Sequence, residues 1–145
     1  METGISVLNT LSRIQNFLEG QHYAVVGASR HRHKYGNKVV RCLLQHGREV
    51  SPVNPRADSV EGLQTYAELS EIETPPHGVC IITPPRVTLP VVEQAAEIGL
   101  QRLWLQPGAE NSAVLDAAER LGLSLISSGP CLLVVMGYHE NGNSK

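Results

Sequence analysis

The stretch His22-Tyr-Ala-Val-Val-Gly-Ala-Ser-Arg-His-Arg-His-Lys-Tyr-Gly36 decides the fold. A short apolar run over 23–26 ends at Gly27, and a polar loop then leads into an amphipathic segment that starts near Asn37. This order is typical of a buried parallel strand that turns tightly into a helix. The stretch therefore predicts the first strand, the first turn and the next helix of an α/β sheet.

The same turn has the chemistry of an anion site. The first backbone N–H groups of a helix have no intrahelical partner, and the helix dipole adds partial positive charge there. Full positive charges in the loop come from Arg30, Arg32 and Lys34. We therefore expect a phosphorylated ligand at this corner.

Outward from this stretch, apolar strands alternate with amphipathic helices. Strands are predicted over 23–28, 49–53, 78–83, 102–105 and 123–126, and helices over 6–19, 37–46, 87–97 and from Asn111 to Gly122. Ser6 is the expected cap of the first helix, Pro90 is expected in the first turn of the third, and a short helix is expected over 67–72. Residues 58–66 are expected to be irregular, and the tail over about 138–145 is expected to fray.

Strands that alternate with helices form a parallel sheet with helices on both faces. The predicted fold is α/β, a Rossmann-like doubly wound parallel sheet of about five strands. The 145 residues are predicted to form a single domain over 1–145.

Composition excludes several classes of function. A net charge of −2 argues against non-specific nucleic-acid binding, which needs a broad basic face. No apolar run approaches the roughly 20 residues that span a bilayer, and the N-terminus shows no secretory signal. The three cysteines, Cys42, Cys80 and Cys131, are an odd number without close spacing, which predicts reduced thiols in a cytoplasmic protein.

Special sequences follow each predicted strand, whereas the loops at the opposite edge are plain helix ends. They lie at 27–29, 54–56, 83–86, 106–110 and 129–131. Ligands of open α/β sheets bind outside the carboxyl ends of the strands. We therefore expect the binding site at this edge.

The type of nucleotide is indicated by two departures from the NAD pattern. Ser29 replaces the second glycine of Gly-x-Gly-x-x-Gly, and the second strand ends in Asn54-Pro-Arg56 without the acid that binds the ribose hydroxyls. A guanidinium suits a ribose that carries its own phosphate. Coenzyme A and NADP therefore fit, and NAD fits poorly.

At these positions the chain resembles a known family, the small bacterial CoA-binding domain proteins related to the N-terminal domain of the succinyl-CoA synthetase α subunit. The motifs are Val-Val-Gly-Ala-Ser29, Lys34-Tyr-Gly36, Pro-Val-Asn-Pro55, Thr-Pro-Pro85 and Leu-Trp-Leu-Gln-Pro-Gly-Ala109, and the similarity runs from about Ile14 to Cys131. Ser128-Gly-Pro-Cys131 departs from the stand-alone proteins and is nearer to the synthetase.

The resemblance implies coenzyme A or acyl-CoA as the ligand and assigns its contacts. The phosphates would lie against Gly27, Ala28, Ser29, Lys34, Tyr35 and Gly36, and the adenosine with its 3′-phosphate against Val53, Asn54, Pro55 and Arg56. The nucleotide and pantetheine path would be lined by Ile82, Thr83, Pro84 and Pro85, and the pantetheine end by Gln106, Gly108 and Ala109.

The resemblance also implies binding without catalysis, because the phosphorylated histidine of the synthetase lies in a second domain. The hypotheses that stay open are an NADP-dependent oxidoreductase, a ligase subunit acting with a partner chain, and a redox sensor that uses Cys131. No catalytic residue is assigned, and no protein partner is indicated. No metal site is expected, because His31 and His33 lack a third ligand.

Overall fold

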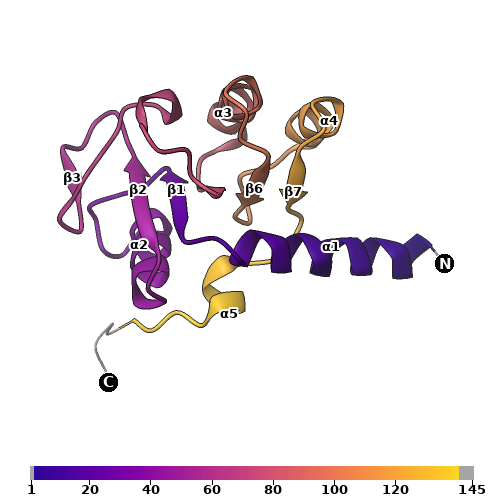
Figure 1. Ribbon diagram of the computed structural model, residues 1–145, viewed down its shortest axis with the longest axis horizontal. Coiled ribbons are helices and arrows are strands. Elements are labelled where there is room, and N and C mark those ends of the chain that lie inside the picture. The colour runs from indigo at the N-terminus through magenta and orange to yellow at the C-terminus, as the bar shows by residue number, and fades with distance from the viewer. Residues whose placement is uncertain (1, 141–145) are drawn as a thin grey trace.

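The computed structural model describes residues 2–140 and has a five-stranded parallel sheet at its centre (Figure 1). The strand order is β2-β1-β5-β6-β7. The strands are β1 (His22–Val26), β2 (Glu49–Val53), β5 (Gly78–Ile81), β6 (Arg102–Leu105) and β7 (Ser124–Ile126). Val26, at the end of β1, pairs with Val53 on one side and Ile81 on the other. The predicted Rossmann-like fold is confirmed.

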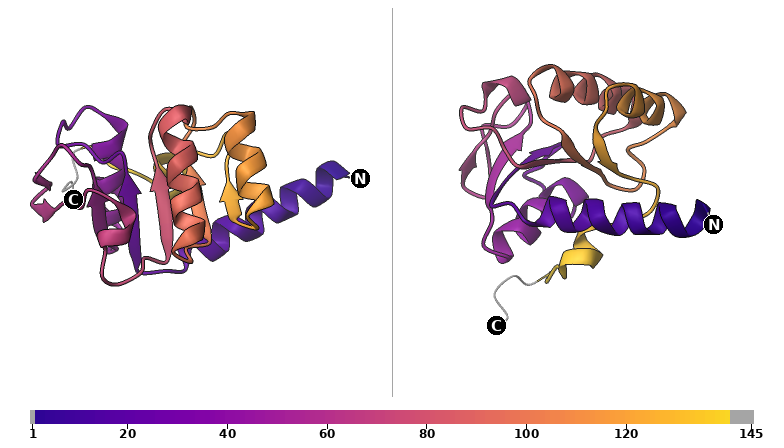
Figure 2. Two further views of the ribbon diagram at one scale, coloured as in Figure 1. Left: turned by 90° about the horizontal axis from the view of Figure 1, so that it is seen from above. Right: turned by 45° about the vertical axis from the view of Figure 1, so that its right-hand side comes forward.

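Helices cover both faces of the sheet, as Figures 1 and 2 show. One face carries α3 (Pro85–Glu97) and α4 (Ser112–Arg120), and the other carries α1 (Glu2–Leu18), α2 (Tyr35–Gln45) and α5 (Leu132–Met136). Successive strand side chains point to opposite faces. In β1, Ala24 and Val26 therefore join the core under α3 and α4, whereas Tyr23 and Val25 join the core under α1, α2 and α5.

Three helices begin at other residues than predicted, and one of them, the second, begins at Tyr35 and not near Asn37. The first helix already begins at Glu2, so Ser6 lies inside it and is not its cap. The third begins at Pro85, whose fixed φ suits a first helical position. Pro90 consequently lies in the second turn, where it is exposed and has no N–H to donate to the carbonyl of Arg86. Asn111 caps α4 as predicted, because its side chain accepts a hydrogen bond from the Val114 N–H at 3.0 Å.

The segment predicted to be irregular forms a hairpin. β3 (Ser59–Val60) and β4 (Leu63–Gln64) pair antiparallel, and the fully buried Val60 anchors them to the core. The short helix predicted over 67–72 is a 3₁₀ turn, η1 (Leu69–Glu71).

The described part of the C-terminal tail, residues 138–140, is held against α2. The Gln45 side chain accepts from the His139 N–H at 3.0 Å and donates to the His139 carbonyl at 2.7 Å. This part therefore differs from the predicted frayed tail, and residues 141–145 lie outside the described residues. Over the described range, no helix has the length and apolar character needed to cross a bilayer.

Candidate functional site

A cleft of about 1040 Å³ opens at the carboxyl ends of β1, β2 and β5. The chain leaves β1 towards β2 on one side and returns to β5 on the other, so this edge is a topological switch point. The loops after the three strands, the start of α2, η1 and one side of α3 line the cleft. The predicted ligand edge and this cleft therefore coincide.

Two glycines allow the backbone of the β1–α2 corner to pack closely. Gly27 has φ +90°, a conformation that side-chain-bearing residues rarely adopt. A methyl group on Gly36 would overlap the carbonyl oxygen of Gly27. The start of α2 therefore lies directly against the turn that follows β1, and only glycine at position 36 permits this contact.

The first turn of α2 faces the cleft with free donors. Lys34 is the N-cap residue, and its side chain makes no capping hydrogen bond. The N–H groups of Tyr35 and Gly36, at the first helical positions, have no intrahelical acceptor. Both residues line the cleft, as does Ser29, whose hydroxyl accepts from the His31 N–H at 3.0 Å. The corner therefore presents backbone donors and partial positive charge to an anion.

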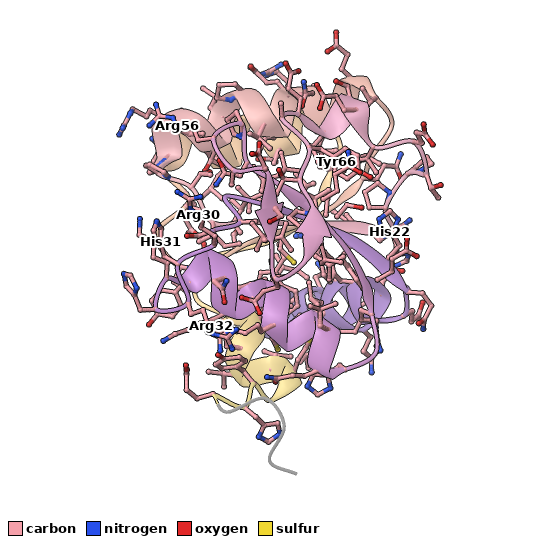
Figure 3. The ribbon with its side chains drawn as sticks, turned by 90° about the vertical axis from the view of Figure 1, so that its left-hand side faces the viewer. His22, Arg30, His31, Arg32, Arg56 and Tyr66 are labelled. Atoms are coloured by element: carbon pink, nitrogen blue, oxygen red, sulfur yellow. The ribbon has the colours of Figure 1, made fainter. Side chains whose placement is uncertain are left out.

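Most of the predicted cations face the cleft. Arg30, Lys34 and Arg56 line it, and among residues 2–140 none of the three lies within 4.0 Å of a carboxylate. Figure 3 shows Arg30, His31 and Arg56 along one side of the molecule, with His22 on the opposite side. Arg32 is the exception to the prediction, because its guanidinium forms a salt bridge at 2.8 Å with Glu61 and does not line the cleft.

The carboxyl end of β2 is hydrogen-bonded to the β1–α2 corner. Asn54 donates its side-chain amide to the carbonyl of Ala28 at 2.8 Å, and its side-chain oxygen accepts from the Arg56 N–H at 2.8 Å. This places the exposed Arg56 side chain across the cleft from the β1–α2 loop. The predicted lining residues Val53, Pro55, Ile82 and Thr83 also face the cleft.

Five predicted contact residues do not line this cleft: Pro84, Pro85, Gln106, Gly108 and Ala109. Gln106 is only 3% exposed, and its side chain has another use. Its oxygen accepts from the Leu132 N–H at 2.7 Å, and its amide nitrogen lies 3.4 Å from the Cys131 sulfur. In the described structure Gln106 therefore positions the start of α5.

The sequence reasoning missed a buried polar pair behind the corner. Asn37 is fully buried, and Arg41, one turn later on α2, is 6% exposed. Arg41 donates to the Asn37 side-chain oxygen and to the Arg32 carbonyl, both at 2.6 Å. The available signal was an Asn-x-x-x-Arg spacing, which places both side chains on one face of a helix whose other inward residues are apolar.

Several residues that could have carried chemistry are structural. Trp104 is fully buried and donates its indole N–H to the Pro130 carbonyl at 3.0 Å. Glu110 accepts from the Ser128 N–H and hydroxyl, both at 2.8 Å. Within the described range, no three potential metal ligands cluster, and the His31 and His33 rings lie 6.1 Å apart.

The three thiols differ in their exposure to solvent. Cys42 and Cys80 are fully buried, and burial raises the pKa of both, that of Cys42 to about 11. Cys131 is half-buried at the start of α5 and does not line the cleft. The structure thus does not bring this thiol to the presumed ligand, and the redox hypothesis stays a prediction.

We expect a thiol reagent at about pH 8 to modify Cys131 well before the other two cysteines, because a raised pKa keeps a thiol protonated and only the thiolate attacks. Mass spectrometry of the native protein after timed labelling measures this order. Cys42 and Cys80 should react only after unfolding. Equal rates for the three thiols would contradict the buried placement of Cys42 and Cys80.

Comparison with known proteins identifies the family of this chain. A protein-family model described as a CoA binding domain matches residues 21–137, which include every element from β1 to α5. The chain belongs to this CoA-binding domain family. The family assignment confirms the resemblance that the strand-end motifs predicted.

Relatives of this CoA-binding domain include larger ligases. The α subunit of an ADP-forming acetate–CoA ligase II from Pyrococcus furiosus is 25% identical over 139 residues, which are 88% of this chain and 30% of the ligase subunit. An uncharacterized protein, YneT, from Bacillus subtilis is 27% identical over 103 residues, which are 71% of this chain and 76% of that protein. The chain thus spans less than a third of the length of the ligase relative.

Solved structures have the same fold. A conserved hypothetical protein from Pyrococcus furiosus is 39% identical with a TM-score of 0.75, and the match covers 79% of this CoA-binding domain chain and 98% of that protein. A dinucleotide-forming acetyl-coenzyme A synthetase from Ca. Korarchaeum cryptofilum is 25% identical with a TM-score of 0.65, and 79% of this chain covers 27% of the synthetase.

Proposed function

We propose that this CoA-binding domain holds coenzyme A or acyl-CoA in the cleft at the β1–α2 corner and catalyses no reaction by itself. The observation that carries the proposal is the convergence of an uncapped helix start with Arg30, Lys34 and Arg56. Backbone donors and fixed cations are what a pyrophosphate with an additional ribose phosphate requires.

The residues present fit this ligand. The close approach of Gly36 to Gly27 holds the start of α2 against the turn after β1, beside the cleft. A pyrophosphate bound there would meet the N–H groups of Tyr35 and Gly36. Arg56, on the opposite wall, would bind the 3′-phosphate of the ribose. Between η1 and α3, the apolar residues Leu69, Val87 and Val91 offer a surface to the adenine or the pantetheine.

Binding without catalysis is supported by the character of the cleft wall. Its described residues supply backbone donors, cations, apolar surface and the carboxylate of Glu68, which accepts a hydrogen bond from Gln94. Among them no nucleophile forms a hydrogen bond with a base that could activate it. The residues proposed to contact the ligand are those that line the cleft. The pantetheine contacts at Gln106, Gly108 and Ala109 stay predictions of the family resemblance.

Calorimetric titration with CoA, dephospho-CoA, NADP and NAD tests the proposal. CoA should bind most tightly, and dephospho-CoA about tenfold more weakly, because it lacks the phosphate that would bind Arg56. Arg56→Gln should remove most of the difference in affinity between CoA and dephospho-CoA. Arg86→Gln is the matched control, because Arg86 is an exposed cation beside the β5 loop that does not line the cleft.

Three outcomes would each contradict a different part of the proposal. Absence of heat with all four ligands would remove CoA binding altogether. Equal affinity for CoA and dephospho-CoA would remove the role of Arg56, and preferential binding of NADP would favour the oxidoreductase alternative.

A second function is favoured by the ligase relatives: a CoA ligase subunit that acts with a partner chain. The α-subunit relative carries a similar domain as less than a third of its length. If the second function holds, the tagged chain should co-purify from its own cells with a protein of ATP-grasp-like sequence. Purification without such a chain, from cells that express one, would contradict it.

A further inference from the structure

The turn between β3 and β4 contains a residue in an unfavourable backbone conformation. Glu61 has φ +50° and Gly62 has φ +78°, so both central residues of a two-residue hairpin turn are left-handed. Such turns favour Asn, Asp or Gly at the first central position, because their side chains tolerate that conformation. A glutamate is strained there, and strain of this kind persists where the side chain has a use.

The Glu61 carboxylate contacts the middle of the β1–α2 loop (residues 27–34, here called the phosphate loop) and the first turn of α2. One oxygen accepts from the Arg32 guanidinium at 2.8 Å, within the loop. The other accepts from the Asn37 amide nitrogen at 3.0 Å, in the first turn of α2. The same Asn37 nitrogen donates to the Ser29 carbonyl at 2.8 Å, so the contact extends to the start of the loop.

The carboxylate is screened from the cleft. Its side chain is only 18% exposed, and Glu61 does not line the cleft. A negative charge facing the ligand would repel phosphate, but this charge is directed to Arg32 and Asn37 behind the loop. Arg32 is thereby neutralised outside the site, while Arg30 and Lys34 remain at the cleft.

We propose that Glu61 is a positioning residue for CoA binding: from the tip of the β3–β4 hairpin it fixes the phosphate loop in the conformation that receives the ligand. This inference rests on the proposed function. Because the free loop is already ordered, less conformational entropy is lost when CoA binds. A role confined to the hairpin would require no carboxylate, and asparagine would serve the turn better.

Glu61→Asn separates the two roles, because it relieves the backbone strain and shortens the side chain away from Arg32 and Asn37. We expect a Tm within about 3 °C of the parent or above it, because the gain in the turn offsets the lost hydrogen bonds. The Kd for CoA should nevertheless rise about five- to tenfold. Hydrogen exchange at the amides of residues 30–36 should become faster in the free protein.

Glu119→Gln is the matched control for charge. Glu119 is exposed on α4, does not line the cleft and forms no ion pair among the described residues, so its loss removes the same charge without affecting the loop or the cleft. In a double-mutant cycle, Arg32→Ala should reduce the effect of Glu61→Asn on the Kd, because one of its two partners is already absent. Additive losses would contradict action through Arg32.

A Glu61→Asn protein that binds CoA as tightly as the parent would overturn the inference and leave the proposed function standing. If the parent itself fails to bind CoA, the proposed function fails. In that case the exchange rates of residues 30–36 still decide whether Glu61 orders the loop, and unchanged rates would refute it.

Discussion

Gly36→Ala is expected to abolish measurable CoA binding and to lower the free energy of unfolding by about 3 kcal/mol. The added methyl would overlap the Gly27 carbonyl oxygen, which belongs to the backbone and has no rotamer to change. The start of α2 would have to move away from the β1 turn. Its free N–H groups would then no longer point to the cleft.

Gly47→Ala is the matched control for this substitution. Gly47 ends α2 with φ +75°, and no atom lies within 4 Å of the position that its Cβ would occupy. The alanine should therefore cost about 1 kcal/mol of stability through its left-handed backbone and leave CoA binding unchanged. Chemical denaturation and calorimetry measure both quantities. CoA binding by Gly36→Ala at parental affinity would show that the close approach is not needed.

Arg41→Ala has the second largest expected effect, a loss of about 3 kcal/mol of stability with CoA affinity reduced at least tenfold. The substitution leaves the buried Asn37 side-chain oxygen and the Arg32 carbonyl without their donor. It also removes the charge near Glu140 and the cation that lies 5.5 Å from the centre of the Tyr138 ring. The back of the phosphate loop would lose its main support.

Arg48→Ala distinguishes loop support from general stability. Arg48 is half-buried and, like Arg41, donates to backbone carbonyls: those of His46 and Leu18, at 2.7 and 3.0 Å. It does not line the cleft. Its loss should lower stability without changing the Kd for CoA, measured well below the melting temperature. If Arg41→Ala and Arg48→Ala weaken CoA binding equally, the proposed link between Arg41 and the loop is wrong.

The sheet and its ligand edge could be predicted because their signals are local. Strands buried on both faces are short apolar runs, and helix ends are marked by residues such as Gly47 and Asn111. The carboxyl ends of parallel strands lie at one edge of the sheet, so the residues after all five strands could be placed at that edge in advance. The strand order, which makes β1, β2 and β5 neighbours, comes from the structure.

The support behind the site could not be predicted, because it depends on contacts between distant segments. Glu61 and Arg32 are separated by 29 residues, and the segment around Glu61 is too polar to predict a strand. The burial of Val60, which anchors the hairpin, is a tertiary effect that outweighs local propensity. The prediction that Arg32 faces the ligand was wrong because it used only sequence neighbours, which are cations. In the structure the neighbour of Arg32 is the carboxylate of Glu61.

Crystals of the protein grown with excess CoA test the cationic corner most directly. The pyrophosphate oxygens should lie within hydrogen-bonding distance of the Tyr35 and Gly36 N–H groups, with the 3′-phosphate beside Arg56. CoA bound elsewhere, with this corner filled by protein side chains, would contradict the proposed site.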